Sequence, residues 1–156
     1  MSFMTSADAD SLMVDTNVLV YAASPGSPLH APALGALTRH RAAGRQLWIS
    51  TQIVREFLVV MCNPNLTTPA FHPERAALAV RYLLRRFCVA EDTTEVSRAL
   101  SRLLALLPPG ARRIHDGNLV ATCQVCGIPA ILTHNPGDFA PFASVITIEP
   151  LVAAPA

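Results

Sequence analysis

The residues best suited to chemistry in this chain are its carboxylates. Only eleven of the 156 residues are acidic, and four of these lie in or beside apolar sequence: Asp15, Glu56, Asp116 and Asp138. An unpaired charge in apolar surroundings is costly, so either each has its own arginine partner or several converge on a cation. Converging carboxylates cannot all stay ionised without compensation, and a hard divalent cation, Mg²⁺ or Mn²⁺, is their natural partner.

Each of these carboxylates also has an ordinary structural interpretation. Asp15 could cap a helix or form an Asx turn, and Asp116 could interact with the dipole at a helix N-terminus. Glu56 could form an ion pair with an arginine, and Asp138 could be a turn residue. All four interpretations would have to hold at once. His115 and His134 flank the candidate residues but lack the HExxH spacing of a zinc hydrolase.

The elements that must position these side chains alternate between strand and helix. We expect strands at 12–14, 47–49, 87–89, 130–132 and 145–148. We expect helices at 29–43, 51–62, 73–86, 92–107 and 113–126, the fourth of them opened by Asp92 with Glu95 three residues later. This alternation predicts an α/β fold with a parallel sheet flanked by helices, in which ligands bind outside the carboxyl ends of the strands.

Composition indicates one globular domain. Hydrophobic residues make up 51% of the chain and charged residues 15%, which excludes a disordered chain. The net charge of +1 does not by itself point to nucleic acid, although all twelve basic residues are arginine, which can bind phosphate with two hydrogen bonds. The longest apolar run, 57–62, is far too short to span a bilayer, so we expect no membrane segment. We expect one domain at 12–150, a flexible tail at 1–11 and a C-terminal tail at 151–156.

The four cysteines do not form a disulfide scaffold. Cys123 and Cys126 have the spacing of half a zinc site or of a redox pair, but no second pair of ligands is evident. The same stretch is typical of a buried helix end before Gly127. With no basic signal sequence at the N-terminus, we expect a cytoplasmic protein.

Four segments together resemble the PIN domain, in the compact form of a VapC-type toxin from a bacterial toxin–antitoxin pair. They are VDTNVLVY at 14–21, VREF at 54–57, HDGNLVA at 115–121 and LTHNPGDF at 132–139. Each motif is weak alone, but four in this order are fairly specific. The resemblance implies a three-layer α/β/α fold with a mostly parallel sheet.

The resemblance also implies a Mg²⁺-dependent ribonuclease, with Mn²⁺ as a substitute metal. Asp15, Glu56 and Asp116 match three acidic positions of the family, with Asp15 and Asp116 as direct metal ligands. Either Asn135 or Asp138 fills the fourth position. Asn17 and Thr133 match polar positions that orient the ligands or water.

An RNA substrate would be held through its phosphates. Arg112, Arg113 and His115, beside Asp116, are the candidate contacts. A second candidate set lies on one predicted helix, where a solvated helix face is the ordinary alternative: Arg81, Arg85 and Arg86. Single-stranded or looped RNA is a more accessible substrate than a duplex.

The resemblance implies two protein partners, a VapB-type antitoxin and a second copy of the chain in a homodimer. Two other functions stay open. The chain could be a non-catalytic PIN-like module that binds RNA or protein, or a housekeeping PIN nuclease without an antitoxin.

Overall fold

A five-stranded parallel sheet forms the centre of the fold. The computed structural model describes residues 7–105, 107 and 113–152. The strands are β1 (Leu12–Val14), β2 (Leu47–Ser50), β3 (Cys88–Ala90), β4 (Ala130–Thr133) and β5 (Thr147–Pro150). They lie in the order β3-β2-β1-β4-β5, and every neighbouring pair is parallel. The predicted α/β class is confirmed.

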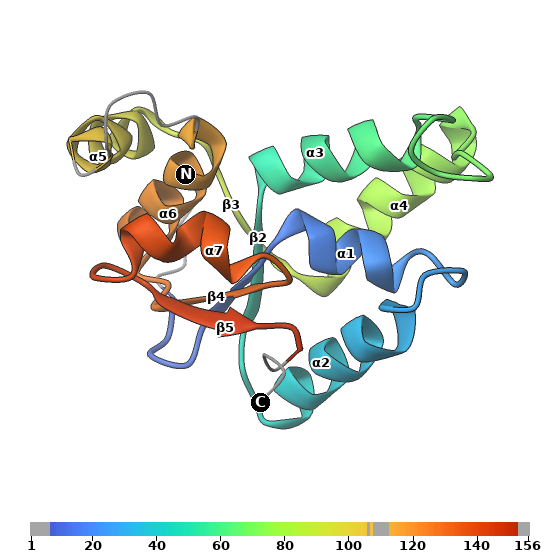
Figure 1. The fold of residues 1–156 in the computed structure, drawn as a ribbon, viewed down its shortest axis with the longest axis horizontal. Helices are drawn as coiled ribbons and strands as arrows, with labels where there is room; N and C mark the ends of the chain where they lie inside the picture. Colours follow the sequence, from blue (N-terminus) through green and yellow to red (C-terminus); the bar gives the residue numbers. More distant parts are fainter. Residues whose placement is uncertain (1–6, 106, 108–112, 153–156) are drawn as a thin grey trace.

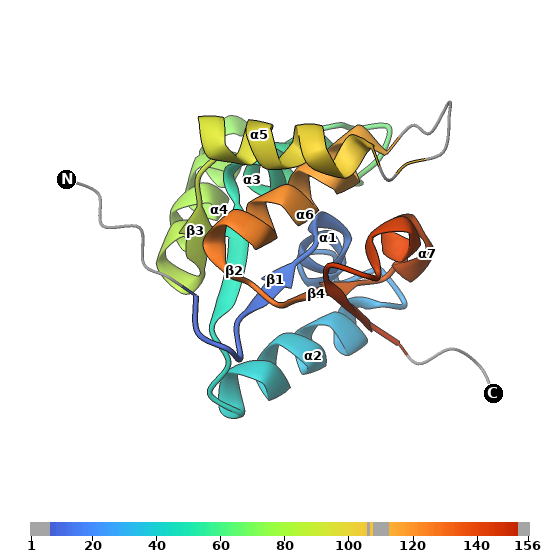
Figure 2. The same cartoon turned by 90° about the vertical axis from the view of Figure 1, so that its left-hand side faces the viewer.

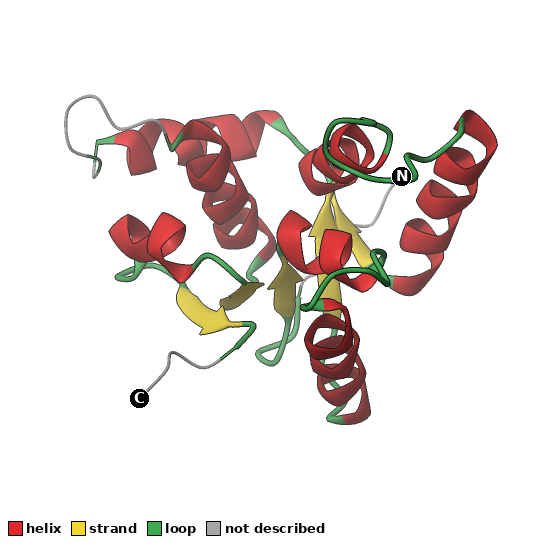
Figure 3. Ribbon diagram, turned by 45° about the vertical axis from the view of Figure 1, so that its right-hand side comes forward, coloured by secondary structure: helices red, strands yellow, loops and turns green. Residues whose placement is uncertain are grey.

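Helices cover both faces of the sheet. They are α1 (Thr16–Ala22), α2 (His30–Ala42), α3 (Thr51–Met61), α4 (Pro73–Arg86), α5 (Thr94–Leu104), α6 (Ile114–Cys126) and the short α7 (Pro136–Phe139). In Figure 1, α5 and α6 lie on one side of the strands and α1 to α4 on the other. Figure 2 shows α5 packed on α6, and Figure 3 shows the strands enclosed between the helices. This is the expected three-layer α/β/α arrangement.

Burial and capping explain most of these elements. All residues of β1, β2 and β4 are buried, as expected for parallel strands covered on both faces. Ser50 caps α3 by accepting a hydrogen bond from the Ile53 amide at 3.2 Å. Gly127 ends α6 with φ of 73°, a left-handed conformation that favours glycine.

Three local predictions differ from the structure. The cap of α5 is Thr93, whose hydroxyl accepts from the Val96 amide, so the prediction that Asp92 opens this helix in a capping box with Glu95 was wrong by one residue. Strand β5 begins two residues later than predicted, because Val145 is still hydrogen-bonded to Phe142 in the preceding turn. Helix α1 was not among the expected elements.

Parts of both predicted tails contact the domain. The Ala7 amide donates to the carbonyl of Cys126, and the Gln46 side chain donates to Asp8 at 2.7 Å. Leu151 is buried, and its amide donates to the carbonyl of Thr133. Residues 1–6 and 153–156 of these tails lie outside the described residues. Within the described part of the chain, no helix combines the length and apolar character needed to cross a membrane.

The strand order creates a switch point in the middle of the sheet. From β1 the chain builds β2 and β3 on one side, then returns to build β4 and β5 on the other. The loops that follow β1 and β4 therefore leave in opposite directions. In open α/β sheets the crevice between such loops, at the carboxyl ends of the strands, is where ligands bind.

Candidate active site

Asp15 lies at this switch point, directly after β1. It caps α1, with Oδ1 accepting from the Thr16 amide at 2.7 Å. Its Oδ2 accepts from the Asn17 side-chain amide at 2.8 Å and from the Thr133 hydroxyl, at the end of β4, at 2.7 Å. Asn17 also accepts from the His134 amide at 3.1 Å, which ties α1 to the end of β4. Three donors from both sides of the switch point therefore fix this carboxylate.

The surroundings of Asp15 favour its protonated form. Burial is the largest cause and raises its pKa from 3.8 to about 6. The hydrogen bonds from Thr133 and Thr16 act in the opposite direction. The charges of Glu56 and Asp116 raise the pKa further, so these three carboxylates are close enough to repel one another. These three carboxylates therefore influence one another electrostatically.

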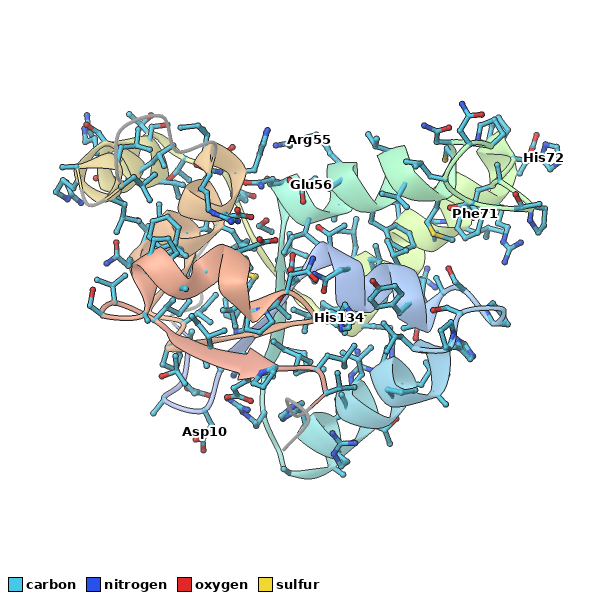
Figure 4. The ribbon with its side chains drawn as sticks, viewed as in Figure 1. Asp10, Arg55, Glu56, Phe71, His72 and His134 are labelled. Atoms are coloured by element: carbon cyan, nitrogen blue, oxygen red, sulfur yellow. The ribbon has the colours of Figure 1, made fainter. Side chains whose placement is uncertain are left out.

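Glu56 projects from α3 toward the same place. Its Oε2 accepts from the Thr16 hydroxyl at 2.7 Å, and its Oε1 accepts from the Gln52 side-chain amide at 2.7 Å. The ring Nδ1 of His115 lies 3.9 Å from Oε1. Figure 4 labels Glu56 on α3 and His134 beside α1, and the rings of His134 and Tyr21 pack perpendicular to each other.

Arg113 connects the remaining two carboxylates. Its Nη1 lies 2.6 Å from Oδ1 of Asp138 and 3.5 Å from Oδ2 of Asp116. Burial raises the pKa of Asp116, and the charges of Asp138 and Glu56 raise it further. The hydrogen bond and the charge of Arg113 lower it. Asp138 therefore belongs to the same electrostatic cluster.

The two candidates for the fourth acidic position differ in their surroundings. Asn135 is exposed, and its described hydrogen bonds at the site are made by its backbone, whose amide donates to the Thr133 hydroxyl and whose carbonyl accepts from the Asp138 amide, both at 3.0 Å. The carboxylate of Asp138 is the one that pairs with Arg113 near Asp116. On geometry Asp138 is the closer fit to an acidic position, and Asn135 stays a supporting candidate.

The proposed RNA-contacting residues divide into two groups. Arg113 and the largely exposed His115 lie at the site, and Arg112 lies outside the described residues. The second set is on α4, where Arg86 lines an apolar groove together with Arg41 of α2. Nothing in the described contacts brings that set to the acidic residues.

Two polar residues of the site were missed by sequence reasoning. Gln52 is 8% exposed and joins Glu56 to α6, and Asn118 donates to Gln52 at 2.8 Å. The signal was available for Gln52, since residues four apart lie on one face of a helix.

Cys123 and Cys126 are buried, and burial raises the pKa of both thiols.

The donor set suits a hard cation, because it consists of carboxylate, hydroxyl and amide oxygens. Among the described residues, no three Asp, Glu, His or Cys side chains are close enough together to hold a metal ion by themselves. A cation would therefore be bound through one or two carboxylates, with water as the other ligands. That is the usual coordination of Mg²⁺ in proteins, so the residues fit this ion.

Comparison with known proteins shows one consistent likeness. Ribonuclease VapC24 of Mycobacterium tuberculosis is 26% identical over 144 residues, which are 91% of this chain and 98% of the relative. Two solved structures share the fold at lower identity. The sarcin-ricin loop cleaving toxin VapC20 of Mycobacterium tuberculosis has a TM-score of 0.62 at 16% identity, covering 89% of this chain and 99% of that chain. A toxin–antitoxin complex from Klebsiella pneumoniae has a TM-score of 0.63 at 19% identity, covering 92% and 99%.

The family model of the PIN domain matches residues 12–143. This range begins at the first residue of β1 and includes the four carboxylates and the arginine of the site: Asp15, Glu56, Asp116, Asp138 and Arg113. With most of its length matched, the chain belongs to the PIN domain family.

Proposed function

We propose that this protein is a Mg²⁺-dependent endoribonuclease that acts as the toxin of a toxin–antitoxin pair, with Mn²⁺ as a substitute metal. The observation that carries the proposal is the partly buried carboxylate of Asp15, which lies with Glu56 and Asp116 at the switch point of the sheet. The similarity to a relative named as a ribonuclease supports the same activity.

In this proposal Asp15 and Asp116 hold the metal, and Glu56 completes the acidic set. Bound Mg²⁺ supplies an activated water and neutralises charge on the phosphodiester. Thr133 and Asn17 keep the carboxylate of Asp15 in one orientation through their hydrogen bonds. We assign contacts with the RNA phosphates to Arg113 and His115. Asp138, which pairs with Arg113, completes the acidic cluster.

The protein partners belong to the proposal as well. Several solved neighbours are complexes of a VapC-type chain with its VapB partner, including VapBC2 from Rickettsia felis, which supports a VapB-type antitoxin here. An apolar groove between α1, α2 and α4 suits such a partner, because Leu34, Leu78 and Tyr82 are exposed there. We also propose a homodimer.

The test is cleavage of a panel of structured RNAs in Mg²⁺, in Mn²⁺ and in EDTA. A stem-loop with the sarcin-ricin sequence belongs in the panel, because one neighbour is described as cleaving that loop. We expect cleavage that requires the metal and is lost in Asp15→Asn and Asp116→Asn. Asp10→Asn is the matched control, since Asp10 is exposed and precedes β1, at the opposite end of the strand from Asp15 (Figure 4).

Two results would contradict the proposal. If cleavage is absent but RNA binding persists in EDTA, the protein is a binding module. If the purified protein is active but its expression alone does not arrest growth, it is a nuclease and not a toxin.

A further inference from the structure

We propose that Gln52 is a positioning residue for RNA cleavage, which fixes Glu56 of α3 relative to the first turn of α6. The inference rests on the proposed nuclease function. It concerns a side chain that lies outside the four motifs and carries no charge.

The carboxamide of Gln52 contacts both helices. Its Nε2 donates to Oε1 of Glu56 at 2.7 Å and to the backbone carbonyl of His115 at 3.1 Å. Its Oε1 accepts from the side-chain amide of Asn118 at 2.8 Å. His115 immediately precedes Asp116, so one side chain holds an acidic residue of α3 and the backbone beside an acidic residue of α6.

The neighbours allow only one orientation of this carboxamide. A carbonyl oxygen and a carboxylate can only accept hydrogen bonds, so both must face the Nε2 of Gln52. The reverse orientation would point Oε1 at Glu56 and at the His115 carbonyl, which is repulsive. All three hydrogen bonds are therefore made in the same orientation of the carboxamide, as expected for a group that sets a geometry.

The two helices depend on this bridge because they pack mainly against other elements. Helix α3 packs on α1, α4 and β2, whereas α6 packs on α5 and α7. A cavity lies between α3, α5 and α6, and Gln52, Glu56, His115 and Asn118 are among the side chains that line it. Beside this cavity, the Gln52 carboxamide supplies hydrogen bonds from α3 to the His115 carbonyl and to the Asn118 side chain of α6.

Glu56 is consequently held at both oxygens, by Thr16 on one and by Gln52 on the other. Loss of the Gln52 contact leaves only the Thr16 hydrogen bond and the His115 ring, 3.9 Å from Oε1, to limit the rotation of the Glu56 carboxylate among the described contacts. A misplacement of about 1 Å in a catalytic group can cost about a hundredfold in rate. We therefore expect the effect of substitution in the turnover step, with substrate binding little changed.

The experiment compares Gln52→Met, which keeps the size and removes every hydrogen bond, with Ser50→Ala. Ser50 is the matched control because it is 2% exposed, is joined to α3 as its cap and contacts none of the acidic residues. We expect Q52M to lower kcat at least about tenfold with KM changed by less than about threefold. S50A should retain kcat within about twofold at temperatures well below its melting point.

A double-mutant cycle with Glu56→Gln separates positioning from general weakening of the fold. If Gln52 acts through Glu56, Q52M has less than about a twofold further effect in the E56Q background. The rise in melting temperature on adding Mn²⁺ is a readout that does not depend on catalysis. This rise should be smaller for Q52M than for S50A.

Three outcomes overturn the inference. They are equal kcat values for Q52M and S50A, an equal loss from Q52M in both backgrounds, and equal Mn²⁺-induced shifts in the two variants. Failure of the wild-type protein to cleave any RNA with metal is a different result. It refutes the proposed function itself, and this inference with it.

Discussion

The partly buried carboxylate of Asp15 should make the stability of the metal-free protein depend on pH. Its pKa is raised from 3.8 to about 6 in the folded state, chiefly by burial. The folded protein therefore binds this proton more tightly than the unfolded chain does. The cost of ionisation is absent below about pH 4, grows between about pH 4 and pH 6, and is complete above about pH 6. A shift of about two units corresponds to about 3 kcal/mol.

Asp15→Asn tests this value, because the amide cannot ionise. Urea unfolding of both proteins in EDTA, between about pH 4 and pH 7.5, gives the difference in the free energy of unfolding at each pH. Contributions from titrating groups common to both proteins largely cancel in this difference. We expect the stability of D15N relative to wild type to rise by about 3 kcal/mol across the range. The sign of the stability difference between D15N and the wild type at any single pH is less informative, because the substitution also changes hydrogen bonds with Asn17 and Thr133.

Ser50→Ala provides the control for this experiment. It removes a helix cap of α3, which costs about 1 kcal/mol, and the lost group does not titrate. The free energy of unfolding of S50A should therefore differ from that of the wild type by the same amount at every pH. If the D15N difference is flat within about 1 kcal/mol over the whole range, burial does not destabilise the ionised form of Asp15 and the reasoning is wrong.

Two further predictions concern neighbouring features. In Arg113→Gln, the pKa of Asp116 should rise further above its ordinary value, because the guanidinium that is lost lowers this pKa in the wild type. A ¹³C NMR titration of the Asp116 carboxyl would measure the change. An unchanged or lower pKa would contradict the pairing of Arg113 with Asp116. Gly127→Ala should destabilise the protein by about 1 kcal/mol in urea unfolding, since a φ of 73° disfavours a side chain. Gly26→Ala is the control and should be near neutral, because Gly26 has open space around it and no positive φ. Equal effects of the two substitutions would contradict this explanation.

The sequence was sufficient to predict the sheet and the gathering of the acidic residues. Strands β1, β2 and β4 are short apolar runs that parallel packing buries on both faces, so their pattern is visible without a structure. Parallel strands present their carboxyl ends at one edge. A carboxylate directly after β1 and the Thr133 hydroxyl at the end of β4 must then be close. Topology makes that contact predictable across 118 residues.

Contacts that depend on side-chain conformation could not be predicted. Arg113 pairs with Asp138, which lies 25 residues later in the sequence. Only the folded path of the chain shows that the Arg113 side chain reaches this carboxylate instead of pointing into solvent. Helix α1 was missed for a different reason. Its segment contains Val18, Val20 and Tyr21, which favour strands locally, but the cap at Asp15 and the burial of Leu19 favour a helix there.

The electrostatics of Asp15 connect the stability of the fold to what the site can bind. With a pKa of about 6, this carboxylate is mostly ionised at neutral pH although it is partly buried. The bonds from Thr16, Asn17 and Thr133 offset only part of the resulting cost, and the charges of Glu56 and Asp116 add to it. A ligand that binds the ionised form would offset this cost, and it would stabilise the folded state increasingly as its free concentration rises above its Kd. A divalent cation meets this requirement, so the feature that destabilises the metal-free protein also favours metal binding.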